Sequence, residues 1–457
     1  MRASSGTRWL RSARAARWAA VALATTQVLA ACSSGVQGET ASSSTTTAAT
    51  DPAAESGPAA PKCGPPACER VEVAGETVSF FVATGRPEPG HELVVVDPGG
   101  PGFDPAVSSS RFETDGLPRW LRERAVFVQR ERWTVDPTVL SERCWDQLAA
   151  AADRRRSGND APDVSCATGA ELFDTPETTA LAIRALVDRF HPSQVTVVGF
   201  SFGALRVAAA SASPSWSSDW RVLIADPAPL ADQMSGPEVL AHRVEAGGAA
   251  VEAAEAGGCR STCSRALTEL AGRLPQEVGD RSVPLTEVDV GLGLASVAGK
   301  DADGRSEVGD QIERFAAGQG DGDLGRLADE ADFASGRYGD RTYSRGALVS
   351  LLGTCLAYGG WSASSPQSSD GTRRFVDAVL SFYRPCRGLA DARSLWPAPA
   401  IIEHSCALLN TQDPLLDRGA VDRWKEQTQA ATTTDWPAHG GALFRTSDPT
   451  SACWRNP

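Results

Sequence analysis

Ser201 lies in a Gly-x-Ser-x-Gly turn, a setting that suits a nucleophilic serine. The segment Gln194–Ala210 reads QVTVVGFSFGALRVAAA: a β-branched apolar run, a Gly-x-Ser-x-Gly turn around Ser201, and small helix formers. Because a serine hydroxyl is a weak nucleophile, an enzyme that uses one holds it at a sharp exposed turn beside a base and backbone N–H donors. Gly199 and Gly203 leave room for such a turn. The segment therefore predicts a strand, a nucleophile elbow and a helix.

A carboxylate and a histidine follow in an order that suits such a serine. Asp413 comes directly after the apolar stretch CALLNTQ, and His439 lies in a glycine-rich loop beyond it. A histidine takes the hydroxyl proton, and a carboxylate orients the imidazole and stabilises the imidazolium. Asp417 is a rival acid but lies in the next loop or helix start, and Asp226 ends another strand. The other histidines have positions that suit structural or surface roles: His91, His191, His242 and His404.

An oxyanion site is expected at a second glycine-rich turn. The buried strand Glu92–Asp97, ELVVVD, runs into Pro98–Gly102, PGGPG. Glycines there allow the backbone to approach a ligand closely. We expect one N–H donor from Phe202, just after the serine, and one from Gly99 or Gly100.

Strands alternate with helices in the part of the chain that would position these residues. Val71–Val73 and Thr77–Val82 predict an antiparallel hairpin, and Glu171–Phe190 predicts a helix with Pro176 in its first turn. Further strands are expected at Glu92–Asp97, Ala125–Gln129, Arg221–Asp226 and Cys406–Thr411. This alternation predicts a doubly wound, mostly parallel sheet.

The strand signal fades between residues 227 and 399. Helical stretches are expected there at Val239–Ala256, Ser264–Leu274 and Arg345–Tyr358, and Gly299–Gly325 is rich in glycine and aspartate. We interpret 227–399 as an inserted, mainly helical lid between two parts of the core, 63–226 and 400–457.

The N-terminus predicts export. Residues 1–31 carry five arginines, no acidic residue and a short apolar run, as in a secretory signal peptide. Leu29–Cys32 resembles a bacterial lipobox, in which Cys32 is lipidated, with a soluble secreted protein as the alternative. Residues 32–62 are too polar to pack and predict a disordered tether. The expected location is the outer face of the bacterial cytoplasmic membrane.

The cysteines fit an exported protein. Ten follow Cys32, an even number that favours disulfides over thiol chemistry: Cys63, Cys68, Cys144, Cys166, Cys259, Cys263, Cys355, Cys386, Cys406 and Cys453. Spacing does not fix their connectivity; one option pairs neighbours in order from Cys144 onward. No histidine pair accompanies the closely spaced cysteines, so no metal site is expected.

The charge balance disfavours one class of partner. The 457-residue chain has a formal net charge of −13, which becomes −18 without the five leader arginines. Such an acidic chain disfavours nucleic acid as a partner.

The motifs together resemble a known family. GFSFG after VTVV, PGGPG after VVVD, Gln412–Pro414 and Ala438–Gly440 are similar to those of α/β-hydrolases, nearest to the prolyl iminopeptidase and tripeptidyl aminopeptidase-like group. The positions of Cys355, Cys386 and Leu395–Pro397 resemble those of cysteines and a tryptophan in that group. The resemblance implies Ser201 as nucleophile, His439 as general base and Asp413 as the orienting acid.

One motif departs from the family pattern. Relatives usually carry Asp-x-Arg-Gly-x-Gly after the strand that follows the oxyanion loop. Here Val128–Trp133 reads VQRERW, and only Arg130 remains in place. The family motif supports loops around the active site, so the change bears on the substrate pocket.

Together with the lipobox at Cys32, the family resemblance implies a membrane-tethered serine hydrolase that needs no cofactor. The expected activity is that of an aminopeptidase, releasing N-terminal residues or short peptides through an acyl-serine intermediate. The alternatives are a carboxylic-ester hydrolase with the same three residues, or a binding lipoprotein built on a hydrolase scaffold.

Overall fold

A computed structural model describes residues 67–445 and 453–454. The gaps within it are 107–115, 137, 162–163, 231, 254–262, 280, 282, 320–323, 339–341, 362–365, 367, 390–393, 398 and 436–437. The expected signal peptide, Cys32 and the tether lie outside the described residues, so their predictions stand as made. In the described part, no helix is long and apolar enough to span a membrane.

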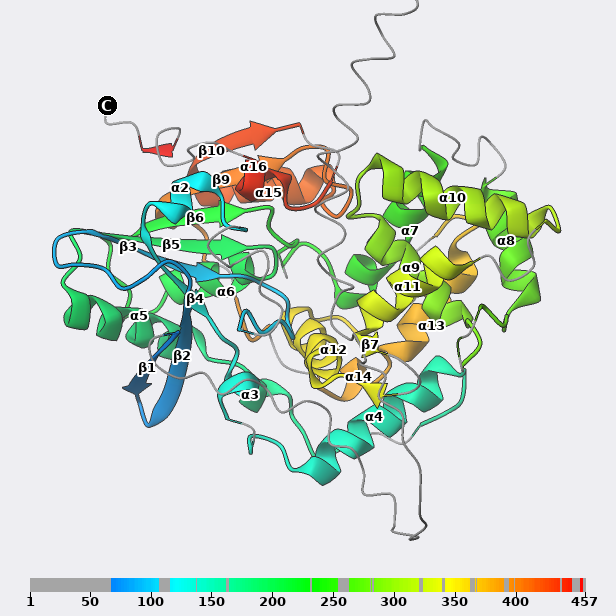
Figure 1. The fold of residues 1–457 in the computed structure, drawn as a ribbon, viewed down its shortest axis with the longest axis horizontal. Helices are drawn as coiled ribbons and strands as arrows, with labels where there is room; N and C mark the ends of the chain where they lie inside the picture. Colours follow the sequence, from blue (N-terminus) through cyan, green and yellow to red (C-terminus); the bar gives the residue numbers. More distant parts are fainter. Residues whose placement is uncertain are drawn as a thin grey trace, which may run out of the picture. The chain divides into compact units, whose positions relative to one another are not determined.

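Eight strands form one sheet in the order β1-β2-β4-β3-β5-β6-β9-β10, drawn in the left half of Figure 1. Its strands are β1 Cys68–Val73, β2 Glu76–Val82, β3 Glu92–Asp97, β4 Ala125–Gln129, β5 Gln194–Phe200, β6 Arg221–Ala225, β9 Ile402–Asn410 and β10 Thr428–Thr434. Strand β2 runs antiparallel to both of its neighbours, and all the other pairs are parallel. This order with one reversed strand is the α/β-hydrolase fold, which confirms the predicted fold class.

The central strands are buried on both faces. In β3, Leu93 and Val95 join the larger apolar core, whereas Val94 and Val96 join a smaller one on the opposite face. Successive side chains of a strand point to opposite faces, so a continuous apolar run is needed where both faces are covered.

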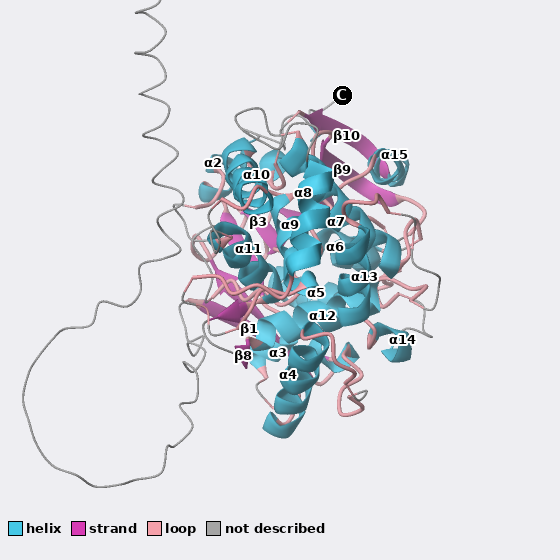
Figure 2. Cartoon of the chain, turned by 90° about the vertical axis from the view of Figure 1, so that its right-hand side faces the viewer, coloured by secondary structure: helices cyan, strands magenta, loops and turns pink. Residues whose placement is uncertain are grey.

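Helices cover the sheet on both sides. The helices that pack beside the sheet are α2 Arg119–Arg122, α3 Arg132–Val135, α5 Pro176–Phe190, α6 Gly203–Ser211, α15 Arg418–Gln427 and α16 Gly441–Arg445. Helix α4 Glu142–Arg156 instead contacts the segment between β6 and β9. Helix α5 begins at Pro176, five residues later than expected, because Thr175 caps it by accepting from the Thr178 N–H. Figure 2 shows β9 and β10 with α15 beside them.

Helices dominate the segment between β6 and β9. They are α7 Gly236–Glu252, α8 Cys263–Arg273, α9 Glu287–Val297, α10 Ala302–Ala316, α11 Gly325–Ser335, α12 Arg345–Ala357, α13 Arg373–Phe382 and α14 Cys386–Leu389. A short hairpin of β7 Arg337–Tyr338 and β8 Thr342–Tyr343 follows α11. The stretches expected at α7, α8 and α12 are helical, with ends shifted by at most four residues. The limits of the inserted segment, 227–399, stay a prediction.

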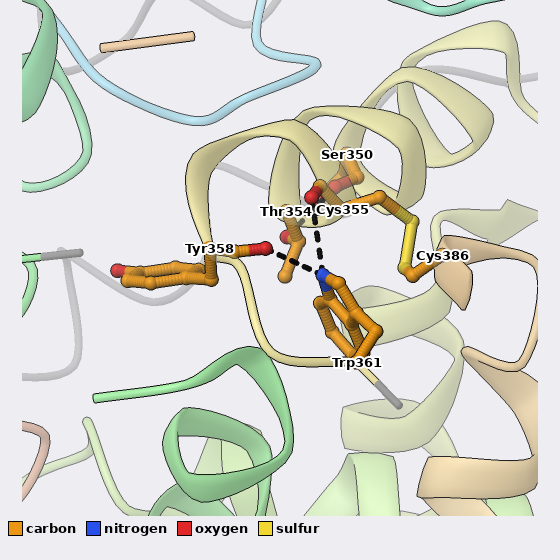
Figure 3. Close-up of a disulfide and its surroundings, with 6 residues drawn as sticks. All are labelled: Ser350, Thr354, Cys355, Tyr358, Trp361 and Cys386. Atoms are coloured by element: carbon orange, nitrogen blue, oxygen red, sulfur yellow. Dashed lines mark hydrogen bonds between the residues drawn. A yellow bond between two sulfur atoms is a disulfide. The ribbon is translucent and has the colours of Figure 1, made fainter. Parts of the chain in front are cut away.

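Three disulfides join described cysteines, and each links neighbours in the chain: Cys144–Cys166, Cys355–Cys386 and Cys406–Cys453. The in-order option is therefore confirmed for these pairs, while Cys259 lies outside the described residues. Figure 3 shows the bridge between the end of α12 and the start of α14, beside which the Trp361 Nε1 donates to the Cys355 carbonyl at 3.1 Å.

Candidate active site

Ser201 occupies a strained turn between β5 and α6. Its φ is 54°, in the left-handed region, and its N–H donates to the Ala225 carbonyl at 3.1 Å. A Cβ on Gly203 would lie 2.4 Å from the Asp97 carbonyl oxygen, and one on Gly199 would lie 2.7 Å from the Ala204 Cα. Both flanking positions therefore require glycine. The strain and the close packing are those of a nucleophile elbow.

The three residues singled out for chemistry meet in space. The Ser201 Oγ lies 3.1 Å from the His439 Nε2, and the His439 Nδ1 lies 2.6 Å from the Asp413 Oδ2. The second Asp413 oxygen accepts from the Leu415 N–H at 2.9 Å, which fixes the carboxylate. A nucleophile bonded to a base, with the base bonded to an orienting acid, is the geometry that activates a serine.

The rival acid Asp417 has a different task. It is the N-cap of α15, where its Oδ1 accepts from the Ala420 N–H at 2.6 Å. Asp417 is thus part of a helix start, as the sequence indicated, and Asp413 alone of the two bonds to the imidazole.

Asp226 supports the histidine loop from below. It follows β6 with a φ of 41°, is fully buried, and accepts from the Ala442 and Leu443 N–H groups at 3.2 and 3.0 Å. These two donors belong to α16, which begins two residues after His439. Burial raises the pKa of Asp226 to about 6, against the lowering effect of His439 and the two N–H groups.

The loop of His439 is held from two further sides. The Asn410 Nδ2 donates to the Ala438 carbonyl at 2.8 Å, and the His439 N–H donates to the Gly299 carbonyl at 3.3 Å. Gly299 lies between α9 and α10, so the inserted segment touches the imidazole-bearing residue directly. Sequence reasoning missed this contact, because nothing in the chain marks Gly299 as a partner of a residue 140 positions away.

The electrostatics of His439 favour its charged form. Burial alone would lower the pKa of the imidazole, but the Asp413 carboxylate, by its charge and its hydrogen bond, and Asp226 by its charge outweigh that effect. The pKa of His439 is therefore raised above its ordinary value. Carboxylates placed in this way stabilise the imidazolium that forms when a histidine takes a serine proton.

Two of the expected oxyanion donors differ in availability. The Gly99 N–H donates to the Asp97 Oδ1 at 3.1 Å, and so it is engaged within the loop. Among the described residues, the N–H groups of Gly100 and Phe202 have no hydrogen-bond acceptor. A Cβ on Gly99 would lie 3.0 Å from the Phe202 nitrogen, which places the two turns against each other. The geometry therefore favours Gly100 over Gly99 as the second donor.

A buried arginine ties the oxyanion loop to the elbow helix. Arg206, on α6, donates to both oxygens of Asp97 at 2.8 and 2.6 Å and to the Gly99 carbonyl at 3.0 Å. It also donates to the Glu131 Oε1 at 2.7 Å. The two carboxylates outweigh burial and raise the pKa of Arg206.

Glu131 explains the departure from the family motif. Its Oε2 accepts from the Gly102 N–H at 2.8 Å and from the Trp133 Nε1 at 2.7 Å, while its Oε1 accepts from Arg206. Burial raises the pKa of Glu131, although each of these donors opposes the rise. Arg130, the residue retained from the motif, pairs with Asp104 at 2.8 Å. The RERW segment therefore still supports the loop, with a carboxylate in place of the usual glycine.

Acidic side chains of the inserted segment have structural partners. Glu238 forms a capping box with Ser235 at the start of α7, and Glu245 accepts from the Ser369 N–H at 2.8 Å. The buried Glu330 is paired with Lys300 at 3.0 Å and with Arg326 at 3.1 Å. No cluster of His, Cys, Asp or Glu among the described residues has the arrangement of a metal site.

Comparison with known proteins gives structural similarity only. No family model and no curated protein matches the chain. Similar solved structures include an esterase (11% identity, TM-score 0.37) and a 2-hydroxy-6-oxo-6-phenylhexa-2,4-dienoate hydrolase from a Rhodococcus strain (12%, 0.37). A third is an enol-lactonase from Burkholderia xenovorans (12%, 0.34). Each match covers 85% of this chain, and 98%, 98% and 100% of the respective neighbour. At such low identities and TM-scores these likenesses carry no argument about activity.

Proposed function

We propose that the protein is a serine hydrolase that transfers an acyl group to water through an acyl-serine intermediate. The observation that carries the proposal is the continuous hydrogen-bonded series from Ser201 through His439 to Asp413. These residues are separated by 238 and 26 positions in the chain, so only the folded chain brings them together.

The first half of the reaction follows from this geometry. The His439 Nε2 takes the proton of the Ser201 hydroxyl as its oxygen attacks the substrate carbonyl carbon. The carbonyl π electrons move onto oxygen, and the N–H groups of Phe202 and Gly100 donate to that oxyanion. The protonated His439 then gives its proton to the leaving amine or alcohol, and the bond to the leaving group breaks.

In the second half of the reaction, water is the nucleophile and Ser201 is the leaving group. His439 takes a proton from water, the hydroxide attacks the acyl carbon, and the proton returns to Ser201 as the acid product leaves. Asp413 remains charged throughout and holds the Nδ1 proton. No step needs a metal or an organic cofactor.

For the substrate, we propose a peptide with a free amino end, cleaved by an enzyme that Cys32 tethers to the outer face of the cytoplasmic membrane. The family resemblance of the motifs supports this proposal. An ester substrate is the second candidate, favoured by one observation: Glu238 is in a helix cap, Glu245 accepts a backbone N–H and Glu330 is in an ion pair. Carboxylates used in this way are poorly placed to hold a substrate ammonium.

Substrate profiling separates these candidates. The mature protein is assayed on aminoacyl and prolyl chromogenic amides, on the same amides with an acetylated amino end, and on short acyl esters. Hydrolysis of the free amides with at least about tenfold loss on acetylation supports the aminopeptidase. Turnover of esters alone contradicts it and supports the esterase. A folded protein that turns over neither class and is not labelled by a fluorophosphonate would be the binding lipoprotein.

A further inference from the structure

Arg337, in the hairpin that follows α11, is a buried cation without a hydrogen-bonded partner among the described residues. Its side chain is 2% exposed, and none of its three nitrogen atoms has a hydrogen-bond partner in the described part of the chain. A guanidinium keeps its charge at any physiological pH. Leaving such a charge buried and unpaired costs several kcal/mol. A buried arginine that persists in the fold therefore calls for a compensating group.

Further donors without acceptors surround Arg337. Electrostatic interactions join it to Arg156 at the end of α4 and to Tyr343 in β8, and Asp332 interacts with Arg337, Arg156 and Arg281 alike. Within the described residues, the Arg156 Nη1, the Arg281 Nη1 and the Tyr343 hydroxyl are buried without partners. The unmatched atoms of this group, which we call the lid arginine cluster (Arg156, Arg281, Arg337 and Tyr343), are nearly all donors.

Two of the three nearby carboxylates, Asp289 and Asp332, accept hydrogen bonds from another arginine. The Asp289 Oδ1 accepts from the Arg156 Nε at 2.6 Å, and its Oδ2 accepts from the Arg156 Nη2 at 2.5 Å and from the Thr286 N–H at 2.7 Å. The Asp332 Oδ1 accepts from the Arg281 Nη2 at 2.8 Å. Asp153 lies within electrostatic range of Arg337 but makes no hydrogen bond to it.

We propose that the lid arginine cluster is the binding site of a small inorganic anion, such as chloride. An anion accepts from several donors at once and compensates the charge of Arg337. A water molecule meets the requirement less well, because it brings two donors of its own that need acceptors. The burial of Arg156 and Arg337, at 1% and 2% exposure, limits the occupant to a small ion.

The anion would join parts of the chain that meet outside the candidate active site. Arg156 ends α4, before the elbow in sequence, whereas Asp289 is on α9 and Arg337 on β7, inside the inserted segment. In Figure 1, β7 lies near α4, α11 and α12. None of the cluster residues belongs to the candidate active site, so the anion acts on the stability of the lid and takes no part in the chemistry.

Thermal unfolding in matched salts tests the proposal. Wild type and Arg337→Met are unfolded in sodium gluconate with increasing replacement by chloride at constant ionic strength, with phosphate as a third salt. We expect the wild-type midpoint to rise saturably by about 2 °C or more, as binding to the folded state requires. The Arg337→Met midpoint stays constant, because methionine fills the space and needs no anion.

Arg130→Met is the matched control. Arg130 is equally buried at 2% exposure but is paired with Asp104, so its loss lowers the midpoint in every salt while the chloride dependence remains. A crystal of the wild type soaked in bromide would show an anomalous peak between Arg337 and Arg156. Equal wild-type midpoints in all three salts, a chloride response that persists in Arg337→Met, or no bromide at the cluster would each overturn the proposal. A response to phosphate alone would also overturn the assignment to a halide-sized ion.

Discussion

Two buried arginines, Arg206 and Arg337, have opposite surroundings. Each nitrogen of the Arg206 guanidinium donates a hydrogen bond, whereas the guanidinium of Arg337 has no hydrogen-bond partner among the described residues. Arg206 donates to Asp97, Glu131 and the Gly99 carbonyl beneath the candidate active site. Arg337 donates to no group in the described chain. A site that must hold a transition state needs preorganised dipoles, and a fully bonded network supplies them. The lid arginine cluster instead has unpaired donors that can bind a ligand.

The strongest test of this contrast replaces each arginine by methionine. Arg206→Met leaves Asp97 and Glu131 buried without their cation, which we expect to cost about 3–5 kcal/mol of unfolding free energy. Arg337→Met removes an unpaired charge and should be neutral or stabilising in chloride-free buffer. Urea unfolding of both variants measures the difference, and equal losses would break the contrast.

A smaller effect is expected at Asp226, in the hydrogen-bonded region around the candidate active site. Asp226→Asn keeps one acceptor for the Ala442 and Leu443 N–H groups but removes the negative charge near His439. That charge helps to raise the pKa of His439, so its loss lowers the pKa. Since the base must be neutral to act, the acid limb of the kcat/KM profile moves to lower pH. The wild-type limb itself should lie above the ordinary histidine value of about 6.5.

The Asp226 result also distinguishes positioning from mere stability. A purely structural role would lower the unfolding midpoint and leave the pH profile in place. A shift of the acid limb toward higher pH, or none at all with activity intact, would contradict the electrostatic role assigned to Asp226.

The smallest effect is expected at the helix cap. Asp417→Ala removes the acceptor of the Ala420 N–H and should cost about 1 kcal/mol of stability. Steady-state kcat/KM should stay within about twofold of the wild type, because Asp417 does not bond to His439. A loss of 100-fold or more in kcat/KM would make Asp417 a candidate for the orienting acid again, beside Asp413.

The sequence predicted what short-range pattern encodes. The elbow, the buried strands and the order of Ser201, Asp413 and His439 follow from local motifs, and the structure brings those three side chains together. Strand β10 was missed, because TQAATTT is small and polar, so that His439 follows β10 and not the CALLNT strand directly. Helix α10 was also missed, since its glycines and acidic residues hide the apolar stripe of Val308, Ile312 and Phe315.

Other features needed tertiary contact to appear. The VQRERW segment looks like a lost motif until Glu131 is seen to accept from Gly102 and Arg206. The contact of Gly299 with His439 joins a loop of the inserted segment to the loop of the candidate base. The absence of a partner for Arg337 depends on what surrounds a buried side chain, which no spacing rule reports.

The central claim is that Ser201 is an activated nucleophile, and active-site labelling tests it most directly. The mature protein is treated with a fluorophosphonate, and the adduct is located by intact mass and peptide mapping. We predict one stoichiometric adduct on Ser201, lost in Ser201→Ala and slowed at least about 100-fold in His439→Ala. Equal labelling of wild type and Ser201→Ala, or no labelling of a folded wild type, would contradict the account.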